Sequence, residues 1–400
     1  MSQPLITVSR AQELVLQATG RLESERVEIA GALNRVLAED VVAVDDVPPF
    51  PCSAMDGFAI RAGEAGRVLR VVGESRAGSP FEGDVGDGQA VRISTGAAVP
   101  TGATAVIRQE DVGADGEQVE VMATTAQGEN VRPRGEDMAS GSLVLPGGTL
   151  LGAVELGAAV AAGGATVAVA RRPRVAVLCT GDELRAPGEP LGPGEIHNSN
   201  APMLAALATS CGAIADGGVR LPDDRAVTEA SLGEALERSE IVAVSGGVSV
   251  GPHDHVKPAL AALGVEEVFW GVALQPGKPT WFGTLGGRLV FGLPGNPVSA
   301  AVTFSLFARP ALLALQGLLP GTAAKRHATL GVAVRRNPRR EQALRVRLEH
   351  RDGATVAVPN GPQGSNIVSS LLGADALAMI PPGEGELEAG ARVALEELPH

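Results

Sequence analysis

The 400-residue chain contains no tyrosine, and only 2% of its residues are aromatic. Its core must therefore be packed mainly from aliphatic side chains. Cysteine is scarce as well: Cys52, Cys179 and Cys211 are odd in number and show no CxxC spacing. Such a set is typical of neither a zinc site nor a disulfide framework, and it predicts a protein of a reducing compartment.

Basic residues are fewer than acidic ones, 33 against 46. The formal net charge is −13, and lysine occurs only at Lys257, Lys278 and Lys325. An acidic surface repels phosphate backbones and anionic lipids, so we expect no nucleic-acid partner and no membrane partner. A local basic pocket for one small anion is compatible with this balance. A lysine kept against a general bias toward arginine can mark a place that needs a compact ammonium group.

The chain also has no clear membrane-spanning run. Residues 1–14 do not show a basic segment followed by an apolar one, which is the pattern of a secretory signal. Residues 150–170 are nearly all apolar, but they include Glu155 and the pair Gly163 and Gly164. We therefore predict a buried helix, a turn and a strand in this segment, and a cytoplasmic protein.

The pattern of what is present predicts a multidomain α/β fold. Near the start, Ser9 can cap a helix, and residues 27–44 form a second apolar, partly helical stretch. Short strands separated by Gly- and Asp-rich turns follow between residues 67 and 121. We predict a helical and extended domain from residues 1–45 plus 140–170, and an inserted β-rich domain at residues 46–139.

Strand and helix signals alternate after Pro173. The predicted strands and helices, in chain order, are residues 174–179, 200–212, 224–238, 241–245, 256–263, 265–270, 288–292 and 298–315. This string indicates a central three-layer domain at residues 171–320, with a parallel sheet covered by helices on both faces. Ligands of such sheets bind beyond the carboxyl ends of the strands. Strand-like segments after residue 340 predict a small C-terminal β domain at residues 321–400.

Three loops fall where the sheet would bind a ligand. The sequence SGGVSVG at residues 245–251 offers close backbone approach and two hydroxyl donors, Ser245 and Ser249, around Gly246 and Gly247. The sequence GLPGNP at residues 292–297 joins a strand to a helix, and helix N-termini favour anions. Lys278 lies between two prolines in a third loop. Each loop alone is a weak signal, but together they favour an anionic ligand with phosphate groups.

Acidic residues form a second set in the loops. They are Asp56, Asp137, Glu183, the pair Asp223 and Asp224, and Asp254. Most loop carboxylates are solvated caps, and near a phosphate site they repel the ligand. Mg²⁺ is the usual reason for such a combination, because it prefers oxygen ligands and bridges carboxylates to phosphates. A transition-metal site at His253 and His255 is less favoured, because these residues lie in a turn rather than a strand.

Seven ordered motifs resemble those of the molybdopterin molybdenumtransferase family, which includes the C-terminal domain of gephyrin. The resemblance covers residues 5 to 398. The motifs are PPF–SAMDGFA (48–59), STGA (94–97), NVR–GED (130–137), TGDEL (180–184), SGGVSVG (245–251), PGKP (276–279) and GLPGNPVSA (292–300). The resemblance implies that the three-layer domain binds molybdopterin and that the C-terminal domain is barrel-like.

The resemblance also implies an activity. Members of this family insert molybdenum from molybdate into the dithiolene of adenylylated molybdopterin and release AMP, with magnesium, as the final step of molybdenum cofactor biosynthesis. The family works as a homodimer, with the active site between the sheet domain of one subunit and the β-rich domain of its partner. Protein partners of such an enzyme would be the molybdopterin adenylyltransferase and recipient apo-molybdoenzymes.

The resemblance also implies which residues form the site, because each motif matches particular positions of this sequence. The expected catalytic residues are Asp56, Asp137, Glu183, Asp254 and Lys278. The expected substrate-binding residues, from the motifs and the loops together, are Thr95, Ser245, Gly246, Gly247, Ser249, Pro294, Gly295, Asn296, Pro297 and Ser365. The expected magnesium ligands are Glu183, Asp223, Asp224 and Asp254.

The chain departs from the family pattern at a few positions. Gly271 and Gln275 stand where the family often has lysine, which removes two positive charges from the expected anion pocket. Phe58 replaces the usual tyrosine. These changes leave two alternatives to the transferase: a molybdopterin-binding carrier or scaffold without turnover, and a molybdopterin adenylyltransferase. The second fits poorly, because an adenylyltransferase resembles only the sheet domain.

Overall fold

The computed structural model describes residues 4–248, 255–318, 326–351 and 353–398. The chain divides into two compact units. The first comprises Met1–Glu25, Asn34–Ala38 and Val169–His400, and the second comprises Arg26–Leu33 and Glu39–Ala168. The strands β1 (Ser24–Glu28) and β12 (Thr166–Ala170) pair as a two-stranded sheet.

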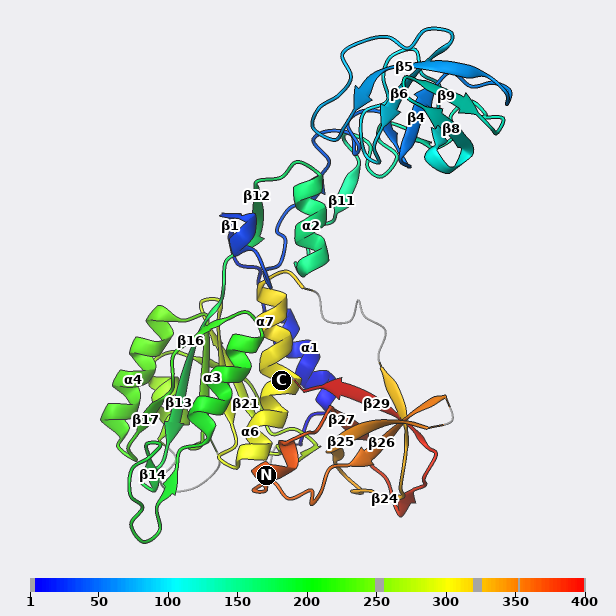
Figure 1. Cartoon of the computed structure of the whole chain (residues 1–400). Coiled ribbons are helices and arrows are strands. Elements are labelled where there is room, and N and C mark those ends of the chain that lie inside the picture. Colours follow the sequence, from blue (N-terminus) through cyan, green and yellow to red (C-terminus); the bar gives the residue numbers. More distant parts are fainter. Residues whose placement is uncertain (1–3, 249–254, 319–325, 352, 399–400) are drawn as a thin grey trace. The chain divides into compact units, whose positions relative to one another are not determined.

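A seven-stranded sheet forms the centre of the first unit (Figure 1). Its strands are β13 (Arg174–Thr180), β16 (Ile214–Ala215), β17 (Val219–Leu221), β18 (Ile241–Ser245), β19 (Glu266–Trp270), β21 (Trp281–Leu285) and β22 (Arg288–Leu293). Both β16 and β17 pair with β13, and the order continues β18, β22, β21, β19. The pairs of β13 with β18 and of β18 with β22 are parallel, so their carboxyl ends lie at one edge.

Helices cover both faces of this sheet. They are α1 (Val8–Gln17), α3 (Asn200–Ser210), α4 (Arg225–Arg238), α5 (Val256–Ala262), α6 (Pro297–Thr303) and α7 (Arg309–Leu315). Alternate residues of β13 face opposite layers: Val175 and Val177 pack in the cluster with α1, α3, α6 and α7, whereas Ala176 and Leu178 pack with α4 and α5. The predicted three-layer fold is therefore confirmed.

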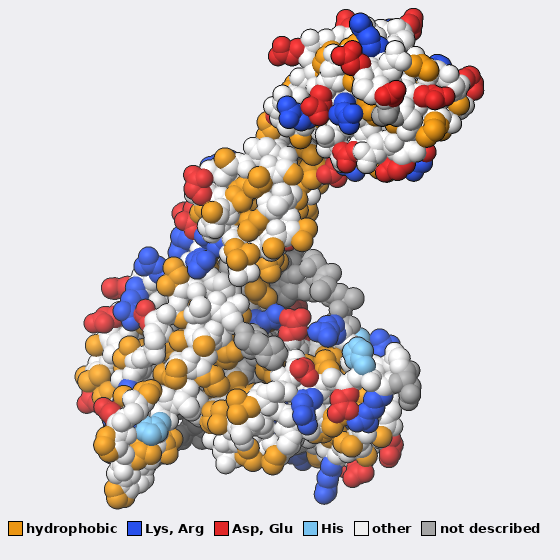
Figure 2. Space-filling model, viewed as in Figure 1, with side chains coloured by type: hydrophobic (Ala, Val, Ile, Leu, Met, Phe, Trp, Pro, Cys, Tyr) orange, Lys and Arg blue, Asp and Glu red, His pale blue; other side chains and the backbone are white. Residues whose placement is uncertain are grey.

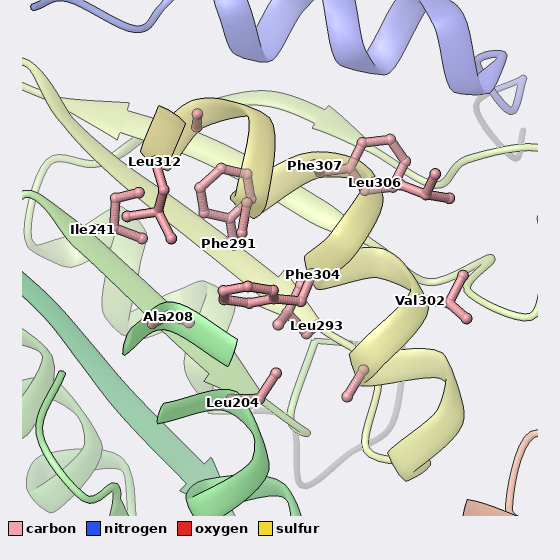
Figure 3. Close-up of a cluster of buried hydrophobic side chains, with 14 of the residues drawn as sticks. Leu204, Ala208, Ile241, Phe291, Leu293, Val302, Phe304, Leu306, Phe307 and Leu312 are labelled. Atoms are coloured by element: carbon pink, nitrogen blue, oxygen red, sulfur yellow. The ribbon is translucent and has the colours of Figure 1, made fainter. Parts of the chain in front are cut away.

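The larger cluster is the core of the first unit. Phe304 and Leu312 lie beside Phe291 of β22, and Phe307 and Leu204 of α3 belong to the same cluster; all of these side chains are fully buried (Figure 3). Their residue types agree with the scarcity of aromatics: a few phenylalanines fill the centre, and alanine, valine and leucine fill the rest.

Two local features of this domain were not predicted. The strand β21 runs antiparallel to β22, to which it connects through Gly286 and Gly287. The predicted single helix at residues 298–315 contains a π-helical turn at Phe304–Ala308. Pro310 explains this turn, because proline lacks an N–H and its ring clashes with the carbonyl one turn earlier.

The segment Pro297–Leu315 is long and apolar enough to cross a membrane, but 83% of it is buried inside the protein. It is the core helix seen in Figure 3.

A second sheet of the first unit closes on itself. Its strands are β20 (Leu274–Gln275), β23 (His327–Leu330), β25 (Glu341–Arg351), β26 (Ala354–Pro359), β27 (Ala376–Ile380) and β29 (Arg392–Glu397). The long strand β25 pairs with both β26 and β27, which gives the predicted small barrel-like domain. Two short pairs accompany the sheets, β14 (Leu184–Arg185) with β15 (Ile196–His197) and β24 (Val334–Arg335) with β28 (Glu386–Leu387).

The second unit is built around a six-stranded sheet. Its strands are β4 (Gly57–Ile60), β5 (Val68–Ser75), β6 (Gln89–Ile93), β7 (Ala105–Arg108), β8 (Val112–Asp115) and β9 (Gln118–Val121). Two short pairs, β3 (Cys52–Ser53) with β10 (Val131–Arg132) and β2 (Val41–Val42) with β11 (Leu143–Leu145), and the helix α2 (Ala153–Ala161) complete this unit.

Three expectations near the start of the chain and around residue 155 were wrong. Thr7, not Ser9, caps α1, because its hydroxyl accepts a hydrogen bond from the Arg10 amide at 3.2 Å. Residues 27–44 form strand segments and one 3₁₀ turn, because tertiary pairing of β1 and β2 overrides their helical pattern. The helix α2 is not buried: only Ala159 is fully covered.

Truncating Phe304 should destabilise the first unit strongly. We expect Phe304→Ala to lower the free energy of unfolding by about 3–5 kcal/mol, because it leaves a cavity in a closely packed cluster. Urea unfolding followed by tryptophan fluorescence measures this unit alone, since Trp270 and Trp281 both lie in its sheet. Phe50→Ala, at an exposed position of the second unit, is the control. Equal stability of the two variants would contradict the assignment of this core.

Candidate functional site

A cavity of about 850 Å³ lies at the carboxyl ends of β13, β18 and β22. It is lined by Cys179, Thr180, Gly181, Glu183, Leu184, Ile196, His197, Asn198, Ser199, Asn200, Asp223, Ser245, Gly246, Gly247, Val248, Pro279, Pro294, Gly295, Asn296, Pro297, Asn366 and Val368. The three strands end beside one another, so the loops that follow them converge on one space.

Glycine shapes the wall at the end of β13. Gly181 has φ +146°, and a Cβ placed there would lie 2.4 Å from a carboxylate oxygen of Glu183. The Glu183 side chain can therefore fold back against the backbone, where it lines the cavity. Gly246, after β18, has φ +89°, and its Cβ would lie 2.8 Å from the Thr180 hydroxyl. At Gly246 the loop after β18 approaches the end of β13 so closely that a side chain is excluded, and at Gly181 the positive φ favours glycine.

Asn200, the first residue of α3, ties the cavity loops together. Its Nδ2 donates to Ser245 Oγ at 2.8 Å and to the Gly295 carbonyl at 2.7 Å. The Ser245 hydroxyl in turn donates to the Pro294 carbonyl at 3.2 Å. A carbonyl can only accept, so the contact with Gly295 settles which end of the amide is the nitrogen. One buried side chain thus connects α3, β18 and the loop after β22.

The loop after β22 also contacts the C-terminal domain. Asn296 Nδ2 donates to Ser365 Oγ at 3.0 Å, and the Val298 amide donates to the Ser365 carbonyl at 3.2 Å. Asn366 lines the cavity beside this contact. The structure therefore brings Ser365, 69 residues away in sequence, next to a loop that follows a sheet strand.

Arg345 holds the segment that carries Ser365. This residue of β25 has no exposed surface, and it donates to Ser370 Oγ at 3.1 Å and to the Gly364 carbonyl at 3.2 Å. Burial lowers the pKa of its guanidinium to about 10, so the group remains charged at neutral pH. Its Nη1 has no hydrogen-bond partner among the described residues. The buried Arg345 therefore holds the loop at residues 362–370 in place.

Several backbone N–H groups at the cavity are free to bind a ligand. Those of Gly247, Gly295 and Asn296 have no partner among the residues that the structure describes, and all three residues line the cavity. Unpaired N–H groups that converge on one space form a binding site for oxyanions. The cavity therefore offers donors on one side and the Glu183 and Asp223 carboxylates on another.

The expected site residues of the first unit divide into four groups. Ser365 contacts a cavity loop through Asn296 without lining the cavity itself. The residues that line the cavity are Glu183, Asp223, Ser245, Gly246, Gly247, Pro294, Gly295, Asn296 and Pro297. Asp224 instead caps α4 by accepting from the Val227 amide at 2.9 Å, and the exposed Lys278 lies beside a lining residue, Pro279, without lining the cavity itself. Ser249 and Asp254, and His253 of the less favoured metal site, lie outside the described residues.

In the second unit, two expected residues contact each other. The Asp56 carboxylate accepts from the Thr95 amide at 2.7 Å and from the Thr95 hydroxyl at 3.2 Å. Both are exposed, as is Asp137, whose amide donates to the Val47 carbonyl at 2.9 Å. Within the described part of the chain, no three His, Cys, Asp or Glu side chains are grouped closely enough to form a metal site by themselves.

The two positions that lack the family's lysines have packing roles. Gly271 is buried with φ +87°, and a Cβ there would lie 2.8 Å from the Leu5 side chain. The Gln275 side-chain oxygen accepts from Asn337 Nδ2 at 2.6 Å, which joins β20 to the C-terminal domain.

Sequence reasoning missed Asn198, Asn200 and Arg345. The available signal for the two asparagines was their position at the start of the predicted helix 200–212 beside the sheet. For Arg345, nothing in the local sequence distinguishes a buried arginine from an exposed one on a half-buried strand.

The thiol at the cavity should be unreactive. Burial raises the pKa of Cys179 to about 11, so about one thiol in a thousand is ionised at pH 8. We expect iodoacetamide to label Cys179 at least about a hundredfold more slowly in the native protein than in urea. Peptide mass mapping over time measures this rate. Rapid native labelling would contradict the burial of Cys179 and would admit a cysteine nucleophile at the site.

Three family models match the chain in order. They are the MoeA N-terminal region (domain I and II) at residues 6–163, a probable molybdopterin binding domain at residues 176–314, and the MoeA C-terminal region (domain IV) at residues 327–398. The cavity described above is formed mainly by the second region, and Asn366 and Val368 come from the third.

Similar proteins match over nearly the whole chain. Molybdopterin molybdenumtransferase 2 of Mycobacterium tuberculosis is 35% identical, covering 98% of this chain and 99% of its own. The molybdopterin molybdenumtransferase of Haemophilus influenzae is also 35% identical, with 99% of each chain covered. A solved structure of the molybdopterin biosynthesis MoeA protein from Pyrococcus horikoshii has a TM-score of 0.84 and 33% identity, again over 99% of each chain. The chain belongs to the molybdopterin molybdenumtransferase family.

Proposed function

We propose that this enzyme inserts molybdenum from molybdate into the dithiolene of adenylylated molybdopterin and releases AMP, the final step of molybdenum cofactor biosynthesis. The cavity at the carboxyl ends of the sheet strands carries the proposal, because it combines free N–H groups with carboxylates. The N–H groups of Gly247, Gly295 and Asn296 suit the pyrophosphate of the substrate, and molybdate is itself a compact oxyanion. The ammonium group of Lys278 would offset charge on the anions, and the hydroxyl of Ser249, which lies outside the described residues, would donate a hydrogen bond to them.

Glu183 is the proposed catalytic carboxylate of this cavity. It would accept a proton from the attacking water while the water oxygen bonds to phosphorus, the bridging P–O bond breaks and AMP leaves. Asp254 would share this work as a second carboxylate of the same site. Because Gly181 has no side chain, the carboxylate of the exposed Glu183 can lie against the backbone at the wall of the cavity.

The donor set fits magnesium. Glu183 and Asp223 offer carboxylate oxygens in the same cavity, and Mg²⁺ is commonly held by one or two carboxylates together with substrate phosphates. We propose that these two, with Asp254 and the neighbouring Asp224, hold the ion, which would neutralise charge on the phosphates. The cap of α4 already occupies one oxygen of Asp224, so Asp223 is the better ligand of that pair.

Replacing Glu183 with glutamine should abolish turnover and spare binding. Glu183→Gln keeps the shape of the side chain but removes the base, so we expect AMP release to fall at least about a hundredfold. Affinity for adenylylated molybdopterin should stay within a few-fold of the wild type. Single-turnover AMP release and equilibrium binding measure the two effects.

Glu234→Gln, at an exposed position of α4, is the matched control and should leave both quantities unchanged. Full activity of Glu183→Gln would contradict the catalytic assignment.

We propose that the enzyme acts as a homodimer whose active site lies between subunits. Asp56, Thr95 and Asp137 of one subunit would position the pterin side of the substrate bound in the cavity of the other. An exposed apolar surface of the second unit supports a homodimer: Val154 and Val160 of α2 and Leu143 of β11 are 79%, 56% and 58% exposed. Figure 2 shows hydrophobic side chains gathered over α2 and β11. A surface of this kind is typical of a protein–protein contact.

Mixing two inactive variants tests this arrangement. Asp56→Asn and Glu183→Gln each damage one half of the shared site, so each homodimer should be inactive. A mixed dimer contains one site with both changes and one site with neither. After random reassociation, half of the dimers are mixed, so about one quarter of the wild-type activity should return. No recovery in dimers shown to have exchanged would contradict a site shared between subunits.

The molybdopterin adenylyltransferase and recipient apo-molybdoenzymes are the proposed protein partners, and the cytoplasm is the proposed location. The alternative of a carrier without turnover is not favoured by the named relatives, and its only support is that Gly271 and Gln275 provide no positive charge. The carboxylates at the cavity oppose it, because a protein that only binds phosphates gains nothing from groups that repel them. An adenylyltransferase would leave the regions outside the sheet domain without a role.

A further inference from the structure

A second cavity, of about 430 Å³, lies at the opposite edge of the same sheet. It is lined by Arg171, Arg174, Glu237, Arg238, Ser239, Glu240, Gly286, Gly287 and Arg288. Arg174 and Arg288 are the first residues of β13 and β22, and Glu240 directly precedes β18. Since β13 has seven residues, the two cavities are separated by the length of the strands, about 20 Å. Nothing in the proposed reaction uses this second cavity.

The charge of this cavity is the reverse of the charge of the chain. It contains four arginines and two glutamates, which gives +2, whereas the whole chain carries −13. Glu240 is already engaged: it accepts from Arg171 Nη2 at 2.8 Å and from the Arg174 amide at 2.7 Å. Burial by itself would raise the pKa of Glu240, but these hydrogen bonds outweigh it and lower the pKa. Glu240 therefore stays ionised and neutralises only Arg171.

Two of the arginines have no carboxylate partner among the described residues. The Arg174 side chain makes no hydrogen bond or ion pair there, and Arg288 donates only to the neutral carbonyl of Glu237, at 3.4 Å. Arg238 pairs with Asp216 at 3.2 Å. The groups that oppose an anion are the exposed Glu237 carboxylate, the Glu240 carboxylate that Arg171 neutralises, and the carbonyls at the end of α4. The remaining wall is the turn of Gly286 and Gly287, where no side chain fills the space.

We propose that this second cavity binds a compact, multiply charged oxyanion of the phosphate type, between the guanidinium groups of Arg174 and Arg288. Guanidinium groups donate paired N–H groups whose geometry matches the oxygens of such anions. The half-buried Arg288 is partly removed from water, which strengthens its interaction with a bound anion. Free phosphate, molybdate and the phosphate of AMP are all oxyanions of this type. The experiment below shows which of the three the cavity binds.

Protection of Arg174 from phenylglyoxal tests the proposal. The purified full-length protein is labelled alone and with increasing phosphate, molybdate or AMP, and peptide mass mapping follows Arg174. The exposed Arg70 of the second unit, whose side chain has no partner among the described residues, is the internal reference. We expect at least about fivefold slower labelling of Arg174 with one of these anions and an unchanged rate at Arg70. The source that protects at the lowest concentration is the preferred ligand.

Two pairs of variants make the result specific. Gly286 has φ +54°, which Asp and Asn both tolerate, so Gly286→Asp adds a negative charge to the cavity wall and Gly286→Asn adds the same volume without charge. The anion concentration that gives half-maximal protection should rise at least about tenfold in Gly286→Asp and in Arg288→Gln. It should stay within a few-fold of the wild type in Gly286→Asn and in Glu183→Gln. Equal labelling of Arg174 with and without every anion, or equal protection in Gly286→Asp and Gly286→Asn, would overturn the proposal.

Discussion

Burial of the three parallel strands β13, β18 and β22 in the middle of one mixed sheet is the constraint on which the rest of the structure depends. Helices cover both faces, so polar groups can meet only at the two edges where the strands begin and end. At the carboxyl edge, the loops carry glycines, asparagines and carboxylates around the larger cavity. At the amino edge, β13 and β22 each begin with an arginine that lines the smaller cavity. The two cavities are thus consequences of one sheet, with opposite chemical character.

Hydrogen bonds between the loops at the carboxyl edge of the sheet hold these loops together as one site. Asn200 joins three elements through its two amide hydrogens, and the contact of Asn296 with Ser365 adds the C-terminal domain. Arg345 holds the segment that carries Ser365, although its burial without a carboxylate partner is costly. Such connections hold N–H groups in place before a ligand arrives, which reduces the ordering that binding would otherwise require.

The sequence predicted well the parts that depend on local patterns. The strand at residues 241–245 and the helix ending at Arg238 lie where the apolar runs and the cap at Asp224 placed them. Residues 27–44 were predicted wrongly, because strand pairing with distant segments decides their structure. In the site, Ser245 could be anticipated because it ends a strand and Glu183 because it follows one, whereas the placement of Arg345 depends on how the C-terminal domain packs.

The measurement that tests the central claim most directly is AMP release from adenylylated molybdopterin by the purified protein, with and without molybdate and Mg²⁺. We predict that release requires both, and that the product activates an apo-molybdoenzyme. Tight binding of the substrate without AMP release under any of these conditions would contradict the account and would identify the protein as a carrier.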